Sequence, residues 1–210
     1  MDESSILPRW LAKHDPGNPF NVEGFECLRF VSSLRATTQD QKIAESYLSL
    51  RHTLGTEHKG RLPDDAVELA CDLRYGYTGE VAEGILCKSS QMEEKWDIYL
   101  YGDRNYFCRS WTGELCFVAE FSTTGSEIVI SRIWAAKELS KPDGRFAIQQ
   151  VDYLIKSHLF KRTVPHPLPE GVPREPEGVG AYSFSQYGRM CCFATYEDTI
   201  TAALKTSSAE

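Results

Sequence analysis

The residues best suited to chemistry are Arg109 and its aromatic neighbours in the stretch Tyr106–Gly113, which reads YFCRSWTG. Arg109 stands two positions from Phe107 and two from Trp111, so a strand would place all three side chains on one face. A guanidinium can stack on aromatic rings and can hold a carboxylate or phosphate through two parallel hydrogen bonds. One hypothesis is therefore an anion or nucleotide pocket centred on Arg109. Its expected lining consists of Arg109, Trp111, Arg74, Tyr75 and Tyr77.

A structural role for Arg109 is the alternative. A buried charge needs a partner of opposite sign. Arg109 could therefore form a salt bridge to an acidic residue of the N-terminal half and close a sheet onto its helices. Of the two roles, the sequence favours the structural one.

The sequence contains none of the short motifs that mark cofactor or metal sites. There is no G-x-x-x-x-G-K-[ST] loop, no G-x-G-x-x-G after a strand and no G-x-S-x-G elbow. The histidines lack the helical spacing of zinc ligands. They are His14, His52, His58, His158 and His166. We therefore expect no cofactor and no metal.

Composition restricts the partners and the compartment. The 210 residues carry a net charge of -7. This acidic balance disfavours nucleic acid and anionic membranes, which attract basic surfaces. The seven cysteines are scattered and odd in number, and the N-terminus lacks the pattern of a signal peptide. These features predict a cytoplasmic protein with reduced, mostly structural thiols.

A predicted β-meander over residues 94–135 would position Arg109. Turn signals at Gly102, Gly113 and Gly125 lie roughly 11 residues apart and separate four aromatic, β-branched stretches. Alternation places Tyr99 and Tyr101 on one face, with Tyr106 on the neighbouring strand. If that face is open, these tyrosines form an aromatic patch for binding another protein. If it is covered, they are core residues.

Periodicity and turn residues predict the flanking elements of a single α+β domain spanning 1–210. Its antiparallel meander of about four to six strands would be covered on one face by helices. Residues 66–75 fit a helix or a strand equally well. The other expected parts are an irregular lead (1–24), a helical hairpin (25–58), a helix (144–161), a Pro-rich loop (163–180) and a strand with a terminal helix (182–205).

Two stretches, Glu93–Tyr99 (EEKWDIY) and Phe107–Gly113 (FCRSWTG), resemble a group of uncharacterised bacterial proteins. That group pairs a W-x-I/V-Y strand with a Y/F-x-R-S-W-T-G strand and turn. The resemblance covers about a quarter of the chain and implies no activity and no catalytic residues.

The function expected from the sequence is non-catalytic. We expect a protein-binding or regulatory domain, by analogy with small acidic bacterial immunity proteins. The alternative is a small-molecule-binding protein or enzyme that uses the Arg109 pocket. A homodimer that pairs through the fourth meander strand, Glu127–Trp134, is a further possibility.

Overall fold

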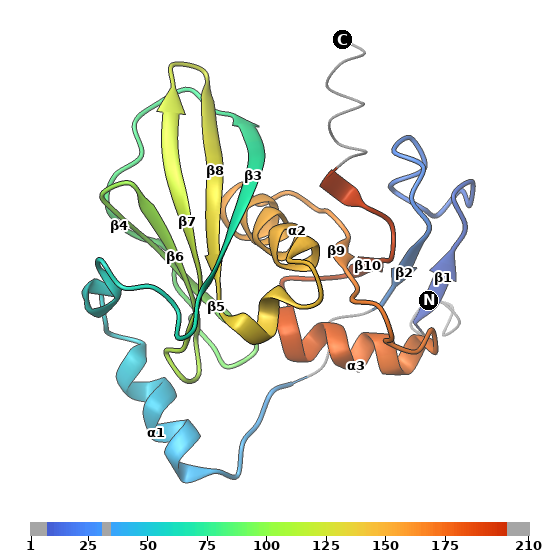
Figure 1. The fold of residues 1–210 in the computed structure, drawn as a ribbon. Helices are drawn as coiled ribbons and strands as arrows, with labels where there is room; N and C mark the ends of the chain where they lie inside the picture. Colours follow the sequence, from blue (N-terminus) through green and yellow to red (C-terminus); the bar gives the residue numbers. More distant parts are fainter. Residues whose placement is uncertain (1–7, 31–34, 201–210) are drawn as a thin grey trace. The chain divides into compact units, whose positions relative to one another are not determined.

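The computed structural model describes residues 8–30 and 35–200 and divides the chain into two compact units (Figure 1). The terminal unit combines Met1–Arg35 with Asp152–Glu210, and the central unit is Ala36–Val151. The sequence predicts one domain, whereas the structure builds one unit from both ends of the chain and the other from its middle. The reason is that strands near the two chain ends pair with each other, which local sequence patterns do not reveal.

The central unit is built on a six-stranded sheet with the order β3-β8-β7-β6-β5-β4. All five strand pairs are antiparallel, so the predicted α+β class with an antiparallel meander is confirmed. The strands are β3 (Val67–Gly76), β4 (Gly84–Cys87), β5 (Trp96–Tyr101), β6 (Arg104–Arg109), β7 (Leu115–Thr124) and β8 (Glu127–Ala135). The open alternative at 66–75 is resolved as a strand.

The fourth strand of the meander is interior. β8 pairs with β7 on one side and with β3 on the other, so it offers no free edge for a second copy. The homodimer contact expected through Glu127–Trp134 is therefore excluded. A strand pairs at a free edge only where its N–H and C=O groups lack a neighbour. In this sheet the outer strands are β3 and β4.

Both faces of the central sheet carry buried side chains. On one face Trp96 stacks on Phe117 with ring centres 5.9 Å apart, and Phe107 meets Phe117 edge-on. On the other face Tyr99, Tyr106, Cys108, Val118 and Trp134 form one cluster. The chain between α1 and β3 contacts this second cluster, so a loop covers part of the face that carries the tyrosines.

Helix α1 (Gln41–Leu50) confirms the second half of the predicted helical hairpin. Asp40 caps it, because its carboxylate accepts hydrogen bonds from the backbone N–H groups of Lys42 and Ile43. The first half is wrong, since Cys27–Arg29 forms strand β2. Residues 31–34, within the predicted first helix, lie outside the described residues. A short 3-10 helix, η2 (Thr56–His58), follows α1.

The terminal unit contains a four-stranded sheet with the order β1-β2-β10-β9. Its strands are β1 (Arg9–Leu11), β2, β9 (His166–Pro167) and β10 (Phe193–Thr195). β1 and β2 pair antiparallel, as do β2 and β10, whereas β10 and β9 are parallel. The expected irregular lead thus contains a strand that is part of the sheet.

Two further helices complete the described chain. A 3-10 turn, η3 (Lys137–Ser140), precedes α2 (Arg145–Leu154), which continues as a π-helical turn, η4 (Ile155–Leu159), and matches the predicted helix. Helix α3 (Pro176–Tyr187) occupies the end of the expected Pro-rich loop and the start of the expected strand. Pro176 at its first turn explains the error, because proline fits there without breaking a hydrogen bond. Residues 201–210 of the expected terminal helix lie outside the described chain.

Candidate functional site

Arg109 stacks on a different aromatic ring from the ones that its sequence spacing indicates. It pairs with Trp96 across strands β5 and β6, and its guanidinium carbon lies 4.9 Å from the centre of the Trp96 ring. Trp111 lies in the turn after β6, where its indole N–H donates to the carbonyl oxygen of Met92 at 2.8 Å. A cross-strand neighbour, rather than a neighbour two positions along the chain, therefore provides the aromatic contact.

Of the expected Arg109 pocket, Arg74, Tyr75 and Tyr77 lie far from Arg109. Arg74 pairs with Val129 on β8, which in turn pairs with Ser122 on β7. Arg109 follows Cys108, which pairs with Leu115 at the opposite end of β7. Seven residues of strand separate these two positions on β7, or roughly 20 Å at about 3.3 Å per residue. The structure therefore does not bring the five residues together.

These three residues, in and just after β3, have local surroundings of their own. The Arg74 guanidinium lies 2.8 Å from Asp72 and 3.4 Å from Glu127 in two exposed ion pairs. Tyr75 is buried. The Tyr77 hydroxyl donates to the carbonyl oxygen of Glu80 at 3.3 Å. Arg74 and Tyr77 therefore make local contacts that stabilise the edge of the sheet.

The three tyrosines of the expected interface hold the chain that covers them. Tyr99 and Tyr106 are 2% and 1% exposed, so neither side chain can anchor a partner protein. The half-buried Tyr101 donates its hydroxyl to the carbonyl oxygen of Leu54. The hydroxyl of Tyr106 accepts from the backbone N–H of Gly60 at 2.9 Å. Alternation places these residues on one face, and the loop docks on their polar ends.

A buried ion pair lies beside Tyr99. The Lys88 ammonium donates to Asp97 and to the Tyr99 hydroxyl, both at 2.7 Å. Asp97 is 3% exposed and also accepts from the backbone N–H of Ser89 at 2.8 Å. Burial, followed by the charge of Asp97, raises the pKa of Tyr99. Both oxygens of Asp97 accept hydrogen bonds and the Lys88 ammonium has two acceptors, which offsets the cost of burying the charges.

Lys95 is the most perturbed cation of the central unit. It is 7% exposed, and its ammonium lies 3.7 Å from the centre of the Trp111 ring and 3.0 Å from the Met92 carbonyl oxygen. Burial, and then the nearby charge of Arg109, lower its pKa to about 8. Sequence reasoning did not identify Lys95, because a lysine between Glu94 and a strand looks like an ordinary surface residue.

The cysteines are free, as the sequence indicates, and four of the seven are buried. Burial raises the pKa of Cys27 to about 11 and that of Cys116 to about 12. A nucleophilic cysteine needs a depressed pKa. These two thiols are therefore packing residues, which agrees with the structural role expected for them.

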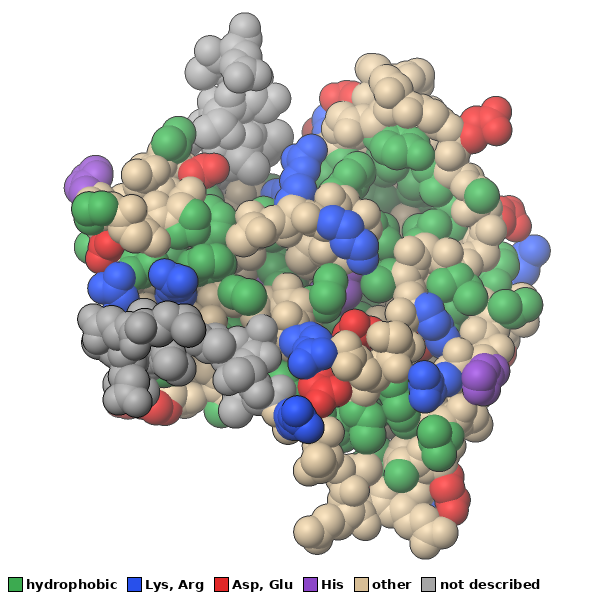
Figure 2. Space-filling view, turned by 180° about the vertical axis from the view of Figure 1, so that it is seen from behind, with side chains coloured by type: hydrophobic (Ala, Val, Ile, Leu, Met, Phe, Trp, Pro, Cys, Tyr) green, Lys and Arg blue, Asp and Glu red, His purple; other side chains and the backbone are tan. Residues whose placement is uncertain are grey.

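The segment from Leu48 to Leu62 exposes three leucine side chains among polar and charged ones. Among residues 8–30 and 35–200, three of the five exposed large hydrophobic residues are on it, namely Leu48 (58% exposed), Leu54 (60%) and Leu62 (40%). Between Gln41 and Leu62 the chain also carries four Lys or Arg residues and two acidic residues, although the whole protein is acidic. Figure 2 shows hydrophobic and basic side chains side by side over the region of α1. We call residues 48–62 the leucine segment.

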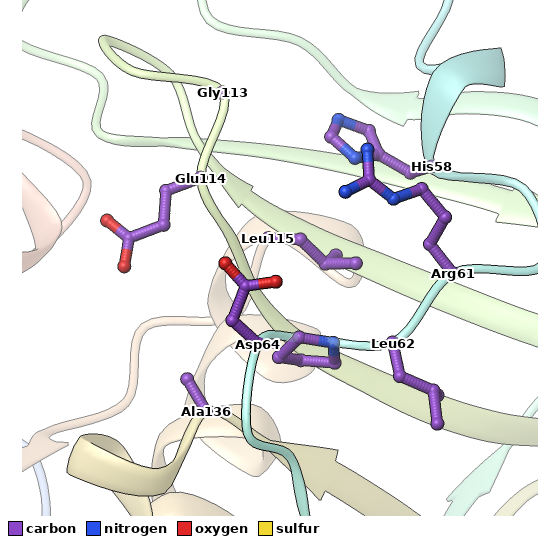
Figure 3. A pocket seen from close by; sticks show the side chains of 9 residues that line it. His58, Arg61, Leu62, Asp64, Gly113, Glu114, Leu115 and Ala136 are labelled. Carbon is purple, nitrogen blue, oxygen red and sulfur yellow. The ribbon is translucent and has the colours of Figure 1, made fainter.

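A pocket of about 200 Å³ lies entirely within the central unit, and the end of the leucine segment supplies three of its lining residues, His58, Arg61 and Leu62 (Figure 3). It is formed by residues 58 and 61–64, by the turn before β7 (Gly113–Leu115) and by Ala136 after β8. Its polar lining is His58, Arg61, Asp64 and Glu114. Burial lowers the pKa of His58, so the imidazole is neutral at neutral pH.

No family model, no curated protein and no solved structure matches this chain. The site must therefore be interpreted from its own geometry. Among the residues that the structure describes, no helix has the length and hydrophobicity needed to cross a membrane. Within the same residues, no three His, Cys, Asp or Glu side chains are placed to hold a metal ion.

The pocket residues carry little signal in the sequence. The stretch Gly60–Asp64 is recognisable only as a turn, and Glu114 is recognisable only as a charge near a strand. The pairing of β6 with β7 and the docking of the loop after α1 bring them together. No spacing rule links loop residues that are 50 positions apart in the sequence.

Proposed function

We propose that the protein is a non-catalytic, protein-binding domain and that the leucine segment is its contact surface. The observation that carries this proposal is the concentration of exposed leucines on one short segment. Isolated exposed apolar residues are normal, but clusters of them indicate an interaction site. The tyrosine patch expected from the sequence is covered, so the binding surface is assigned to the segment that covers it.

The exposed leucines provide a useful binding energy. Fully burying a leucine contributes about 1.5–3 kcal/mol. Since Leu48, Leu54 and Leu62 are 40–60% exposed, covering all three would contribute about 3–4 kcal/mol in total. That is enough for a few anchor residues to dominate an interface of ordinary size.

The charge of the segment indicates the kind of partner. Its excess of Lys and Arg favours an acidic surface, which would raise the rate of association and orient the complex. We propose that the partner is another protein in a bacterial cytoplasm. By analogy with small bacterial immunity proteins, binding would regulate or neutralise that partner.

The test compares two matched variants as affinity baits. The triple variant Leu48→Gln/Leu54→Gln/Leu62→Gln keeps helix propensity while removing the apolar groups. The control, Val22→Gln/Ile85→Gln, changes two exposed large hydrophobic residues outside the leucine segment. A partner captured by the wild type should bind the control with unchanged affinity and the triple variant at least tenfold more weakly. Equal affinity for both variants would exclude the leucine segment as the contact surface.

A further inference from the structure

The pocket at the end of the leucine segment separates charges of opposite sign. In Figure 3 the carboxylates of Asp64 and Glu114 lie to one side, and the guanidinium of Arg61 and the ring of His58 lie to the other. Because His58 is neutral at neutral pH, Arg61 is the positive end. The pocket is therefore a dipole with two negative groups opposite one positive group.

These charges are not neutralised within the protein. In residues 8–30 and 35–200, the side chains of Arg61, Asp64 and Glu114 make no hydrogen bond and no ion pair. All three side chains are exposed, so solvent rather than another protein group surrounds their charges. Three unpaired charges around one hollow leave donors and acceptors available for a ligand.

The middle of the pocket is apolar. Leu115 lies between the carboxylate side and the guanidinium side in Figure 3, and Leu62, Pro63 and Ala136 complete the lining. Small-molecule sites combine apolar walls with a few convergent polar groups in this way. The apolar middle suits a short hydrocarbon body that connects two charged ends.

The size of the pocket limits the ligand. Its volume of about 200 Å³ is below the roughly 300–1,000 Å³ of pockets for drug-sized ligands. A nucleotide is therefore too large. A second carboxylate opposite one guanidinium also disfavours an anion that lacks a positive group, because like charges repel. The ligand must be small and must carry both signs.

We propose that this pocket binds a small zwitterion of the amino-acid class. Its ammonium group binds Asp64 and Glu114, its carboxylate binds Arg61, and its short apolar part contacts Leu115. The pocket shares His58, Arg61 and Leu62 with the leucine segment, but small-molecule binding is measured on the protein alone, without a partner protein. The two proposals can therefore fail separately.

The test is calorimetric titration of the whole protein with a defined panel. The probes are glycine, L-alanine, L-leucine, β-alanine and γ-aminobutyrate, together with the amide and N-acetyl forms of L-alanine and L-leucine. The ω-amino acids vary the separation of the two charges. We expect at least one free amino acid to bind and its amide and N-acetyl forms to bind at least tenfold more weakly. No binding by any zwitterion, or equal binding of the blocked forms, overturns the proposal.

Single substitutions test which residues bind the carboxylate and which bind the ammonium group of the ligand. Arg61→Gln should remove the preference for the free acid over its amide, and Glu114→Gln should reduce the preference for the free amine over its N-acetyl form. Ala136→Phe should weaken all probes by filling the hollow without changing charge. Arg29→Gln and Glu80→Gln, on exposed residues outside the pocket, are the controls. Preferences that persist in Arg61→Gln and Glu114→Gln would also overturn the assignment.

Discussion

Gly55, at the start of the loop that covers the tyrosine face, should be highly sensitive to substitution. Its φ of 76° lies in the left-handed region, and an added Cβ would lie only 2.5 Å from the ring of Tyr99. Gly60, five residues later, has nearly the same φ of 77°, but an added Cβ would meet nothing within 4 Å. Comparing alanine substitutions at Gly55 and Gly60 therefore separates the energetic cost of a left-handed backbone from the cost of a steric clash with Tyr99.

The two substitutions should lower the free energy of unfolding by measurably different amounts. Placing alanine in the left-handed region costs about 1 kcal/mol at either position. Overpacking against a buried ring adds about 1–3 kcal/mol at Gly55 alone, because Tyr99 is fixed by Lys88 and its neighbouring strands. We expect Gly55→Ala to lower the free energy of unfolding by about 3 kcal/mol and Gly60→Ala by about 1 kcal/mol.

Urea unfolding followed by tryptophan fluorescence measures this difference. Trp96, Trp111 and Trp134 belong to the central unit and only Trp10 to the terminal unit, so the signal reports mainly the relevant unit. Equal losses for Gly55→Ala and Gly60→Ala would refute the inference that the loop is docked on Tyr99. A Tyr99→Leu background should reduce the Gly55→Ala penalty, because residues in contact are energetically coupled.

Three further predictions concern the buried charges and the titrating groups. Asp97→Ala should cost about 3 kcal/mol by leaving Lys88 unpaired, and Lys88→Met/Asp97→Leu should cost less, as urea unfolding would report. The pKa of Lys95 is about 8 in the folded protein and 10.5 for an unperturbed lysine. The unfolded chain therefore binds this proton more tightly, and the free energy of unfolding rises as pH rises from about 8 to about 10.5. Between about pH 7 and pH 10 the wild type should gain roughly 2 kcal/mol relative to Lys95→Met, and parallel stability curves would contradict this. Burial lowers the pKa of His158 to about 4, so stability is lost as pH falls below about 6.5, by roughly 2–3 kcal/mol at pH 4.5. The His158→Gln variant should lose less stability than the wild type as pH falls, so its acid-unfolding midpoint should lie at a lower pH. An unchanged midpoint would show that protonation of His158 does not control acid unfolding.

The hydrogen bonds of His158 explain why its protonation is costly. The Ser157 hydroxyl donates to the Tyr153 carbonyl oxygen at 2.6 Å, so it can only accept from Nδ1 of His158. The other ring nitrogen, Nε2, is then an acceptor, and it is buried without a partner. Adding a proton there would place a charge in an apolar environment.

The meander could be predicted because its signals are local. Alternating apolar residues and turn glycines lie within each hairpin, and adjacent hairpins need no distant partner. The same logic placed Tyr99 and Tyr106 correctly on one face of the sheet. It could not show that a loop covers that face, because docking depends on hydroxyl contacts with Leu54 and Gly60 across about 50 residues of sequence.

The errors occur where distant pairing overrides local propensity. Phe25 and Leu28 have helical spacing, but Leu28 pairs with Trp10 on one side and with Ala194 on the other. In α3, Val179, Ser183 and Tyr187 form the buried helical stripe, and a serine in its centre conceals that pattern. Sequence patterns also fail to predict that the charged pocket residues lie together, because separate loops rather than one motif supply them.

The terminal sheet has a consequence for synthesis on the ribosome. Every strand of the central unit has been made once synthesis reaches Ala135. Strand β2, by contrast, cannot pair with β10 until Phe193–Thr195 has been made. A two-stranded β1–β2 hairpin is marginally stable alone, and the unpaired edge of β2 is a site for wrong pairing. The nascent chain can therefore fold its middle first, while the β1–β2 pair lacks its third strand until Phe193–Thr195 has been made.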